Sequence, residues 1–297
     1  MYDFSTIAEL VAEAERTGWP ISSVVIAHEA DESQKSYDEV VGQMRSSWQT
    51  MKNAIDKGIR TPGKSVSGLT GGDAPKIHSW LFAPAGKSYL GELACCACAG
   101  AVSVAEVSAG MGRIVACPTA GSCGIVPGAL YAAHRYMVKN DEPIVRALFT
   151  AAGFGMIIDE MACIAGAEGG CQAECGTAAA MAAAALTELA GGTPDAVAHA
   201  AALALKNLLG LACDPVAGLV EVPCIKRNGF IAVHSLTAAD MALAGVRSVI
   251  PPDEVVMAMK EIGDQLPIAL KETATGGLAA TPTGRRLKEQ IFGKQTE

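Results

Sequence analysis

The sequence predicts an all-α fold, a multi-helix bundle whose helices are joined by long Gly-rich loops. Half of the 297 residues are apolar but only 5% are aromatic. The apolar side chains are therefore mostly Ala, Val, Leu, Ile and Met, which favour close-packed helices over a sandwich or barrel. Apolar residues recur at helical spacing, and no segment alternates between apolar and polar residues as a half-buried strand does. We expect a single helical domain over residues 1–297.

Two helices are expected in the first 60 residues. Thr6 and Glu9 form a capping box ahead of an apolar stripe, and Gly18 ends this first helix. The second helix covers 37–58, where apolar residues recur at steps of three and four, the period of one helical face. The segment 59–91 contains six Gly and three Pro, so we expect it to be irregular.

Downstream, Ala-rich runs alternate with connectors that are rich in Gly and contain Cys. We expect helices at 92–111, 128–139, 144–157, 177–191, 194–210, 231–247 and 252–264. The clearest start is at Thr193, a capping residue that is followed by Pro194 at the first helical position. We look for function in the connectors, because a buried Gly-rich loop has backbone groups that need a ligand or a special geometry.

Composition argues against several classes of partner. The net charge of −8 leaves no basic stripe for nucleic acid or an anionic membrane surface. One uncharged run, 114–133, is long enough to span a bilayer, but its prolines and glycines favour a buried loop instead. The N-terminus is acidic where a signal peptide is basic. We therefore expect a cytoplasmic protein whose ten cysteines are thiols.

The cysteines fall into two groups. The first group lies in an Ala-rich helical run, where thiols usually pack as small apolar side chains, and consists of Cys95, Cys96 and Cys98. By contrast, Cys171, Cys213 and Cys224 stand at Gly or Pro turns. The spacings of zinc sites and ferredoxins are absent. Three thiolates from separate loops can hold three irons of a [4Fe–4S] cluster and leave the fourth iron open as a Lewis acid. Spacing alone leaves structural thiols as the alternative.

Two further loops place hydroxyl groups between glycines. Ser67, Thr70 and Gly71 belong to KSVSGLTGGD, and Thr119 and Ser122 belong to CPTAGSCG. Such loops present N–H and O–H donors that suit a carboxylate or a phosphate. Neither loop matches the phosphate-binding G-x-x-x-x-G-K-[ST] motif. Ordinary Gly-rich turns remain the alternative for each.

Five motifs occur in one order along the chain: KSVSGLTGGDA, CPTAGSCGIVPGAL, GAEGGCQAECG, LGLACDPVAGLVEVPCIKRN and GGLAATPTGR. Together they resemble the α subunit of the bacterial iron–sulfur-dependent L-serine dehydratases, over nearly the whole chain. The resemblance implies a [4Fe–4S] cluster held by Cys171, Cys213 and Cys224. It also implies β-elimination of L-serine to pyruvate and ammonia without pyridoxal phosphate, with both hydroxyl loops on the substrate carboxylate. It does not identify the catalytic base.

The chain departs from the family pattern in two ways. Cys123 stands where the family often has a small residue, and the tail IFGKQTE lacks the C-terminal Cys of some members. Some members also begin with a β domain, whereas this sequence starts in the helical region. We therefore expect a separate β subunit. An iron–sulfur hydro-lyase acting on a small hydroxy acid, which would release no ammonia, and a noncatalytic helical subunit, which would bind no iron, are the alternatives.

Overall fold

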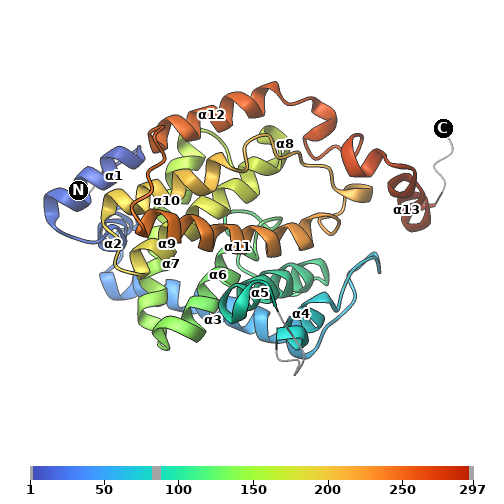
Figure 1. Ribbon diagram of the computed structural model, residues 1–297, viewed down its shortest axis with the longest axis horizontal. Coiled ribbons are helices and arrows are strands. Elements are labelled where there is room, and N and C mark those ends of the chain that lie inside the picture. The colour runs from blue at the N-terminus through green and yellow to red at the C-terminus, as the bar shows by residue number, and fades with distance from the viewer. Residues whose placement is uncertain (1–2, 82–87, 294–297) are drawn as a thin grey trace.

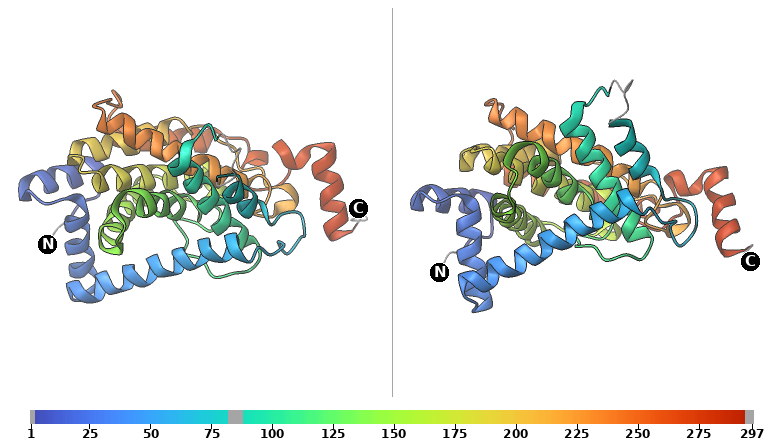
Figure 2. Two further views of the ribbon diagram at one scale, coloured as in Figure 1. Left: turned by 60° about the horizontal axis from the view of Figure 1, so that its bottom comes forward. Right: turned by 90° about the horizontal axis from the view of Figure 1, so that it is seen from below.

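The computed structural model describes residues 3–81 and 88–293, which form an all-helical bundle as the sequence predicts (Figure 1). The described residues contain no strand, and one isolated β-bridge joins Cys213 to Lys271. The bundle is elongated, with the N-terminal helices at one end of its long axis and the C-terminal helix at the other (Figures 1 and 2).

The N-terminal part consists of α1 (Ile7–Thr17), α2 (Ile21–Ser33) and α3 (Tyr37–Arg60). The predicted capping box is present, since Thr6 Oγ1 accepts from the Glu9 backbone and the Glu9 side chain accepts from the Thr6 backbone. Helix α3 extends along one side of the bundle (Figure 2). Helix α2 is not among the expected helices, because its buried residues Val24, Val25 and Ile26 are consecutive and show no helical period.

The core is built from α5 (Gly91–Ala109), α6 (Ile125–Ala133), α7 (Asp141–Met161), α9 (Thr177–Leu189), α10 (Pro194–Lys206) and α11 (Cys224–Leu243). Helix α9 packs against α6, α7, α10 and α11, and every residue from Thr177 to Thr187 is buried. Small residues let the helix axes approach closely. A Cβ on Gly100 of α5 would lie 3.3 Å from the Gly128 Cα of α6. This packing accounts for the low aromatic content.

Two of the expected helices differ from the observed ones in where they begin or in their helix type, which changes the lengths of the connecting loops. The helix expected at 128–139 is α6 followed by a π-helical turn, His134–Val138. The helix expected at 231–247 already begins at Cys224. The apolar run 114–133 combines a loop with α6, so the expectation of a buried loop holds only for its first part.

The expectation that 59–91 is irregular is wrong for α4 (Asp73–Leu81). The backbone N–H groups of Asp73 and Ala74 donate to the two carboxylate oxygens of Glu106 on α5, at 2.7 and 3.3 Å. These bonds satisfy donors that the first turn of a helix leaves unpaired. Since this cap comes from a different helix, the sequence around Asp73 does not show it.

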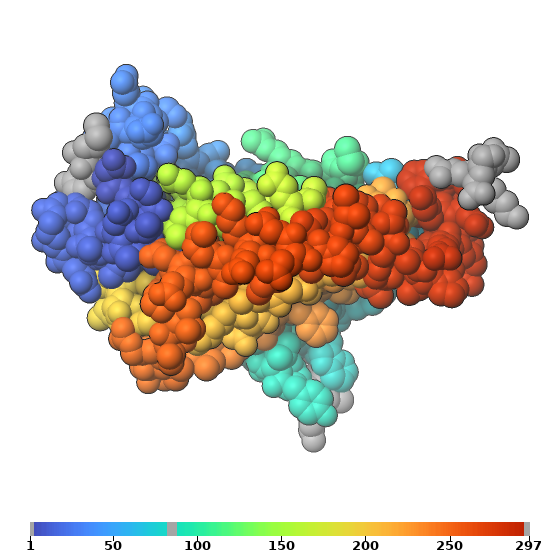
Figure 3. Space-filling model, turned by 90° about the horizontal axis from the view of Figure 1, so that it is seen from above, coloured from blue at the N-terminus to red at the C-terminus, as the bar shows by residue number. Residues whose placement is uncertain are grey.

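The remaining elements are α8 (Gly166–Gly169), the π-helical turn Gln172–Gly176, α12 (Pro252–Gln265), α13 (Pro282–Phe292) and 3₁₀ turns at Val216–Gly218, Ile268–Leu270 and Gly277–Ala280. Helix α12 crosses one face of the molecule (Figure 3) and packs against α1 and α10. Helix α13 is not among the expected helices either, although Thr281 caps it and Pro282 follows, the same pattern that predicts the helix after Thr193.

Helix α5 is long and apolar enough to cross a membrane. However, 67% of its apolar window is buried inside the bundle, where it packs against α3, α4, α6 and α11. Helix α5 is therefore apolar because it is a core helix of the bundle.

Candidate active site

The three cysteines predicted as cluster ligands lie on separate segments that meet in the bundle. Cys171 precedes the π-helical turn, Cys213 lies in the connector after α10, and Cys224 begins α11. All three are buried. The Sγ atoms of Cys171 and Cys175 are 3.3 Å apart, and Cys213 and Cys224 are close enough for the charge at Cys171 to help raise the pKa of each. We call Cys171, Cys175, Cys213 and Cys224 the thiol site.

Backbone contacts fix the position of Cys213. Its N–H donates to the Leu270 carbonyl at 2.9 Å, and its own carbonyl accepts from the Glu272 N–H at 2.9 Å. Arg227 of α11 donates to the Ala212 carbonyl at 2.9 Å and pairs with Asp214 at 3.3 Å. The connector that carries Cys213 is therefore held from both the C-terminal segment and α11.

The thiol site favours one negative charge, at Cys171. Hydrogen bonds from the Cys175 and Cys213 thiols, followed by the charge of Arg227, hold the pKa of Cys171 well below its usual value. The bond to Cys171 and burial raise the pKa of Cys175 and of Cys213. Burial, then the charge at Cys171, raises the pKa of Cys224 to about 12. The low pKa of Cys171 and the raised pKa values of its neighbours thus favour a single thiolate, at Cys171, near the partly buried guanidinium of Arg227.

The donor set fits an iron–sulfur cluster. Among the described residues, no three His, Cys, Asp or Glu side chains converge as the ligands of a single metal ion do. A [4Fe–4S] cluster does not need that convergence, because each thiolate binds a different iron at its own corner. All ten cysteines are free, so Cys171, Cys213 and Cys224 offer three buried thiols. Cys175, in contact with Cys171, is too close to it for both to bind separate irons as they stand.

The cysteines predicted to be structural, on α5, and Cys123, expected near the substrate, belong to apolar clusters or helix faces apart from the thiol site. Cys95, Cys96 and Cys98 are on α5, as expected, and burial raises the pKa of Cys96 and of Cys98 to about 11. Cys123, the departure from the family pattern, is fully buried in a small apolar cluster with Ile55 and its neighbours. These thiols pack as apolar side chains.

Residues 117–124, which we call the Thr119 loop, lead into α6. The Ser122 hydroxyl donates to a backbone carbonyl of the same loop at 3.1 Å. The Thr119 hydroxyl donates to Glu174 Oε1 at 2.7 Å. The other oxygen of this carboxyl group, Oε2, is 4.0 Å from Cys213 Sγ. Glu174 therefore lies between the Thr119 loop and the thiol site.

Asn228 connects the Thr119 loop to α11. Its side chain is fully buried. It accepts from the Gly124 N–H at 2.8 Å and donates to the carbonyls of Gly121 at 2.8 Å and Cys224 at 2.9 Å. A Cβ on Gly121 would lie 3.0 Å from Glu174 Oε1, so glycine lets this carboxyl group approach the loop closely. Asn228 thus fixes the loop relative to a predicted iron ligand.

Residues 64–73, which we call the Ser67 loop, also meet a carboxylate. The hydroxyls of Ser67 and Thr70 donate to Glu221 Oε2 at 2.7 and 3.1 Å, and Glu221 is buried. Gly71 has a φ of +126°, and a Cβ there would overlap the backbone carbonyl of Gly63. Ser67 and Thr70, the predicted hydroxyl residues of this loop, therefore contact the same side chain, in the segment that leads to Cys224.

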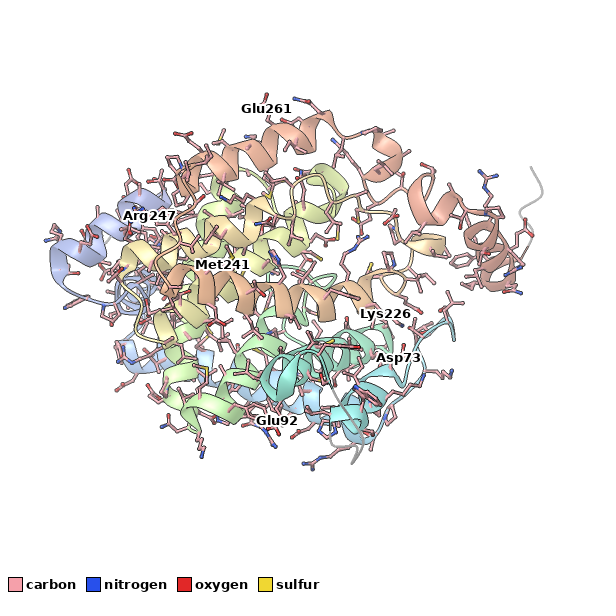
Figure 4. The ribbon with its side chains drawn as sticks, viewed as in Figure 1. Asp73, Glu92, Lys226, Met241, Arg247 and Glu261 are labelled. Atoms are coloured by element: carbon pink, nitrogen blue, oxygen red, sulfur yellow. The ribbon has the colours of Figure 1, made fainter. Side chains whose placement is uncertain are left out.

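An ion pair adds a second link between the Ser67 loop and α11. Lys226 Nζ lies 2.7 Å from Asp73 Oδ2, and both side chains are labelled in Figure 4. Lys226 follows Cys224 by two positions on α11. The Ser67 loop and the Thr119 loop are consequently both attached to the first turns of the helix that carries Cys224.

Sequence reasoning missed the two carboxyl groups of this site, Glu174 and Glu221. Each lies three residues from a predicted ligand, Cys171 and Cys224 respectively, and that proximity was the available signal. Burial, partly offset by the Thr119 hydroxyl, raises the pKa of Glu174 to about 7. The site therefore combines thiols, loop hydroxyls and a carboxyl group that can exchange a proton near neutral pH.

Comparison with known proteins identifies the family. The family model described as "Serine dehydratase alpha chain" matches residues 16–279. The chain is 50% identical over 290 residues to the "Probable L-serine dehydratase, alpha chain" of Bacillus subtilis, covering 98% of this chain and 96% of that protein. It is 40% identical to the "L-serine dehydratase, alpha chain" of Peptoniphilus asaccharolyticus, covering 97% and 98%. With "L-serine dehydratase 1" of Escherichia coli the identity is 37%, over 94% of this chain but 62% of that protein. The chain therefore belongs to the serine dehydratase alpha chain family.

Proposed function

We propose that this chain is the catalytic α subunit of an L-serine ammonia-lyase, which converts L-serine to pyruvate and ammonia. The observation that carries the proposal is that three thiols from separate segments lie near one another beside Glu174 and the Thr119 loop, while the Ser67 loop contacts Glu221, three residues ahead of Cys224. The names of the relatives support serine as the substrate.

Cys171, Cys213 and Cys224 would hold a [4Fe–4S] cluster, since they supply three thiols and no fourth ligand is required for an open iron. When bound, the cluster supplies a Lewis acid that stabilises the leaving hydroxyl group of serine. Arg227 supports binding of the cluster, because its partly buried positive charge favours the thiolate form of Cys171.

The two loops would bind and orient the substrate. Ser67, Thr70 and Gly71 on one side, and Thr119 and Ser122 on the other, supply hydroxyl and backbone donors for the serine carboxylate. In the structure three of these hydroxyls already donate to carboxylate oxygens of the protein, which supports their use as carboxylate donors. Fixing the carboxylate orients the Cα–H bond toward a base.

Glu174 is the group best placed to move a proton. Its Oε1 accepts from the Thr119 hydroxyl, and its Oε2 faces Cys213. A carboxyl group between the substrate loop and the thiol site can accept the proton from Cα at Oε2. The aminoacrylate formed by elimination then tautomerises and is hydrolysed to pyruvate and ammonia without further need of the protein.

A separate β subunit would complete the enzyme, and we place the enzyme in the cytoplasm. The relatives of similar length are named alpha chains, which supports a second chain. The acidic charge of the chain supports a soluble, small-molecule role over binding to nucleic acid or to an anionic membrane.

The test is anaerobic purification of the chain, followed by measurement of iron, visible absorbance, pyruvate and ammonia. We expect about four irons per chain, and equal amounts of pyruvate and ammonia from L-serine once the β subunit is added. Turnover of a small hydroxy acid without ammonia release would favour a hydro-lyase instead. Absence of iron would favour a noncatalytic subunit.

A further inference from the structure

Cys175 has no role in the proposed cluster site, yet it touches one of the proposed ligands. Its Sγ lies 3.3 Å from Cys171 Sγ, and both side chains are buried, at 1% and 3% exposed. The two residues are four positions apart around the turn Gln172–Gly176, so about one turn of helix separates them and their side chains lie on the same face. An approach of about 1.3 Å would bring the sulfurs to bonding distance.

We propose that Cys171 and Cys175 form a disulfide when the thiol site is without metal and meets hydrogen peroxide. One sulfur attacks the peroxide, the O–O bond breaks, and the sulfur becomes a sulfenic acid while one water leaves. The second sulfur then attacks the first, the S–S bond forms, and the sulfenic oxygen leaves as a second water. The two thiols give up two electrons and two protons, and one peroxide is reduced to two waters.

The pairing with Cys175 is favoured over pairing with Cys213. Cys175 lies on the same turn as Cys171, so the disulfide closes a short loop without moving another segment. Cys213 is held by backbone bonds to Leu270 and Glu272, and its Sγ faces Glu174. Moving Cys213 toward Cys171 would have to strain those bonds.

The consequence for the cluster rests on the proposed function. If Cys171 is an iron ligand, the disulfide removes it and leaves two thiols, Cys213 and Cys224, which cannot hold three irons. An oxidised chain would then bind no cluster until a thiol reductant opens the disulfide. The Cys171–Cys175 pair would act as a reversible block that protects Cys171 from irreversible oxidation.

Peptide mapping tests the disulfide directly. The metal-free chain is treated anaerobically with one equivalent of hydrogen peroxide, its free thiols are alkylated in denaturant, and it is digested with trypsin. Cys163, Cys171 and Cys175 fall in one tryptic peptide, 147–206, whereas Cys213 falls in 207–226. Further cleavage after glutamate separates Cys171 in 169–174 from Cys175 in 175–188.

We expect most of the oxidised chain to contain 169–174 linked to 175–188. The link should be absent from Cys175→Ala and from Cys175→Ser, and Cys163→Ala, a matched control in the same tryptic peptide, should retain it. Recovery of alkylated Cys171 from the oxidised wild type, or its linkage to 207–226, would overturn the proposal.

Reloading with iron and sulfide tests the consequence. We expect the oxidised wild type to bind less than about one-tenth of the iron that the reduced chain binds, and dithiothreitol to restore the full amount. Equal iron uptake without the reductant would show that the disulfide does not block the site. If the reduced chain takes up no iron either, the proposed function fails, while the peptide map still decides whether the disulfide forms.

Discussion

Replacing Asn228 with Ala should loosen the Thr119 loop and destabilise the fold by an amount that the structure allows us to estimate. The Asn228 side chain serves three backbone groups: the Gly124 N–H and the carbonyls of Gly121 and Cys224. The Cys224 carbonyl lies in the first turn of α11 and keeps its helical partner. The Gly124 N–H, which is buried, and the Gly121 carbonyl, which is partly buried, lose their only side-chain partner.

A buried group left without a partner costs about 1–3 kcal/mol and the partly buried Gly121 carbonyl adds less, so we predict a loss of about 2–4 kcal/mol. That is a large part of the total stability of a typical domain, which is about 5–15 kcal/mol. The measurement is urea unfolding of the metal-free chain, followed by circular dichroism in the presence of a reductant. The variant should also bind less iron, because the start of α11, which carries Cys224, is no longer connected to the Thr119 loop through Asn228.

Ser235→Ala is the matched control. Ser235 is also fully buried on α11, but its hydroxyl donates to the Ile231 carbonyl of the same helix at 2.9 Å. Its removal leaves a carbonyl that keeps its helical bond, so we expect a loss of only about 1 kcal/mol. Equal losses in the two variants would refute the reasoning, since the connection between segments would then contribute nothing beyond a local bond.

Further predictions concern the proposed chemistry. Changing any one of the three predicted ligands to Ala should remove most of the bound iron, whereas Cys96→Ala on α5 should retain it; iron analysis after anaerobic purification decides between these outcomes. Ser67→Ala or Thr70→Ala should lower kcat/KM for L-serine about ten- to a hundredfold with iron content unchanged, and unaltered kinetics in both would make the loop merely structural. Glu174→Gln should lower kcat far more than it raises KM, because the amide cannot accept a proton; a change confined to KM would assign it to binding. Air or an iron chelator should abolish activity, and hydroxylamine, which attacks pyridoxal phosphate, should leave it intact. The chain without its β subunit should show little turnover, and full turnover alone would make the partner at most regulatory.

Much of the fold could be predicted because its signals are local. The capping box at Thr6, the Thr193–Pro194 start and the apolar period of 37–58 each act within a few residues. Where a helix depends on a distant group, prediction failed. Helix α4 begins where Glu106, 33 residues away from Asp73, accepts its first N–H groups.

The candidate site divides in the same way. The sequence by itself determined the all-α class, the presence of thiols at three Gly or Pro turns, and the two hydroxyl loops, since residue type and turn chemistry are properties of short segments. Only the tertiary structure decided which groups meet. It placed Ser67 on Glu221 across 154 residues of chain and Thr119 on Glu174 across 55, and it set Cys175 against Cys171. These pairings depend on how the helices pack and bring distant loops together, and no periodicity, cap or spacing within one segment carries that information.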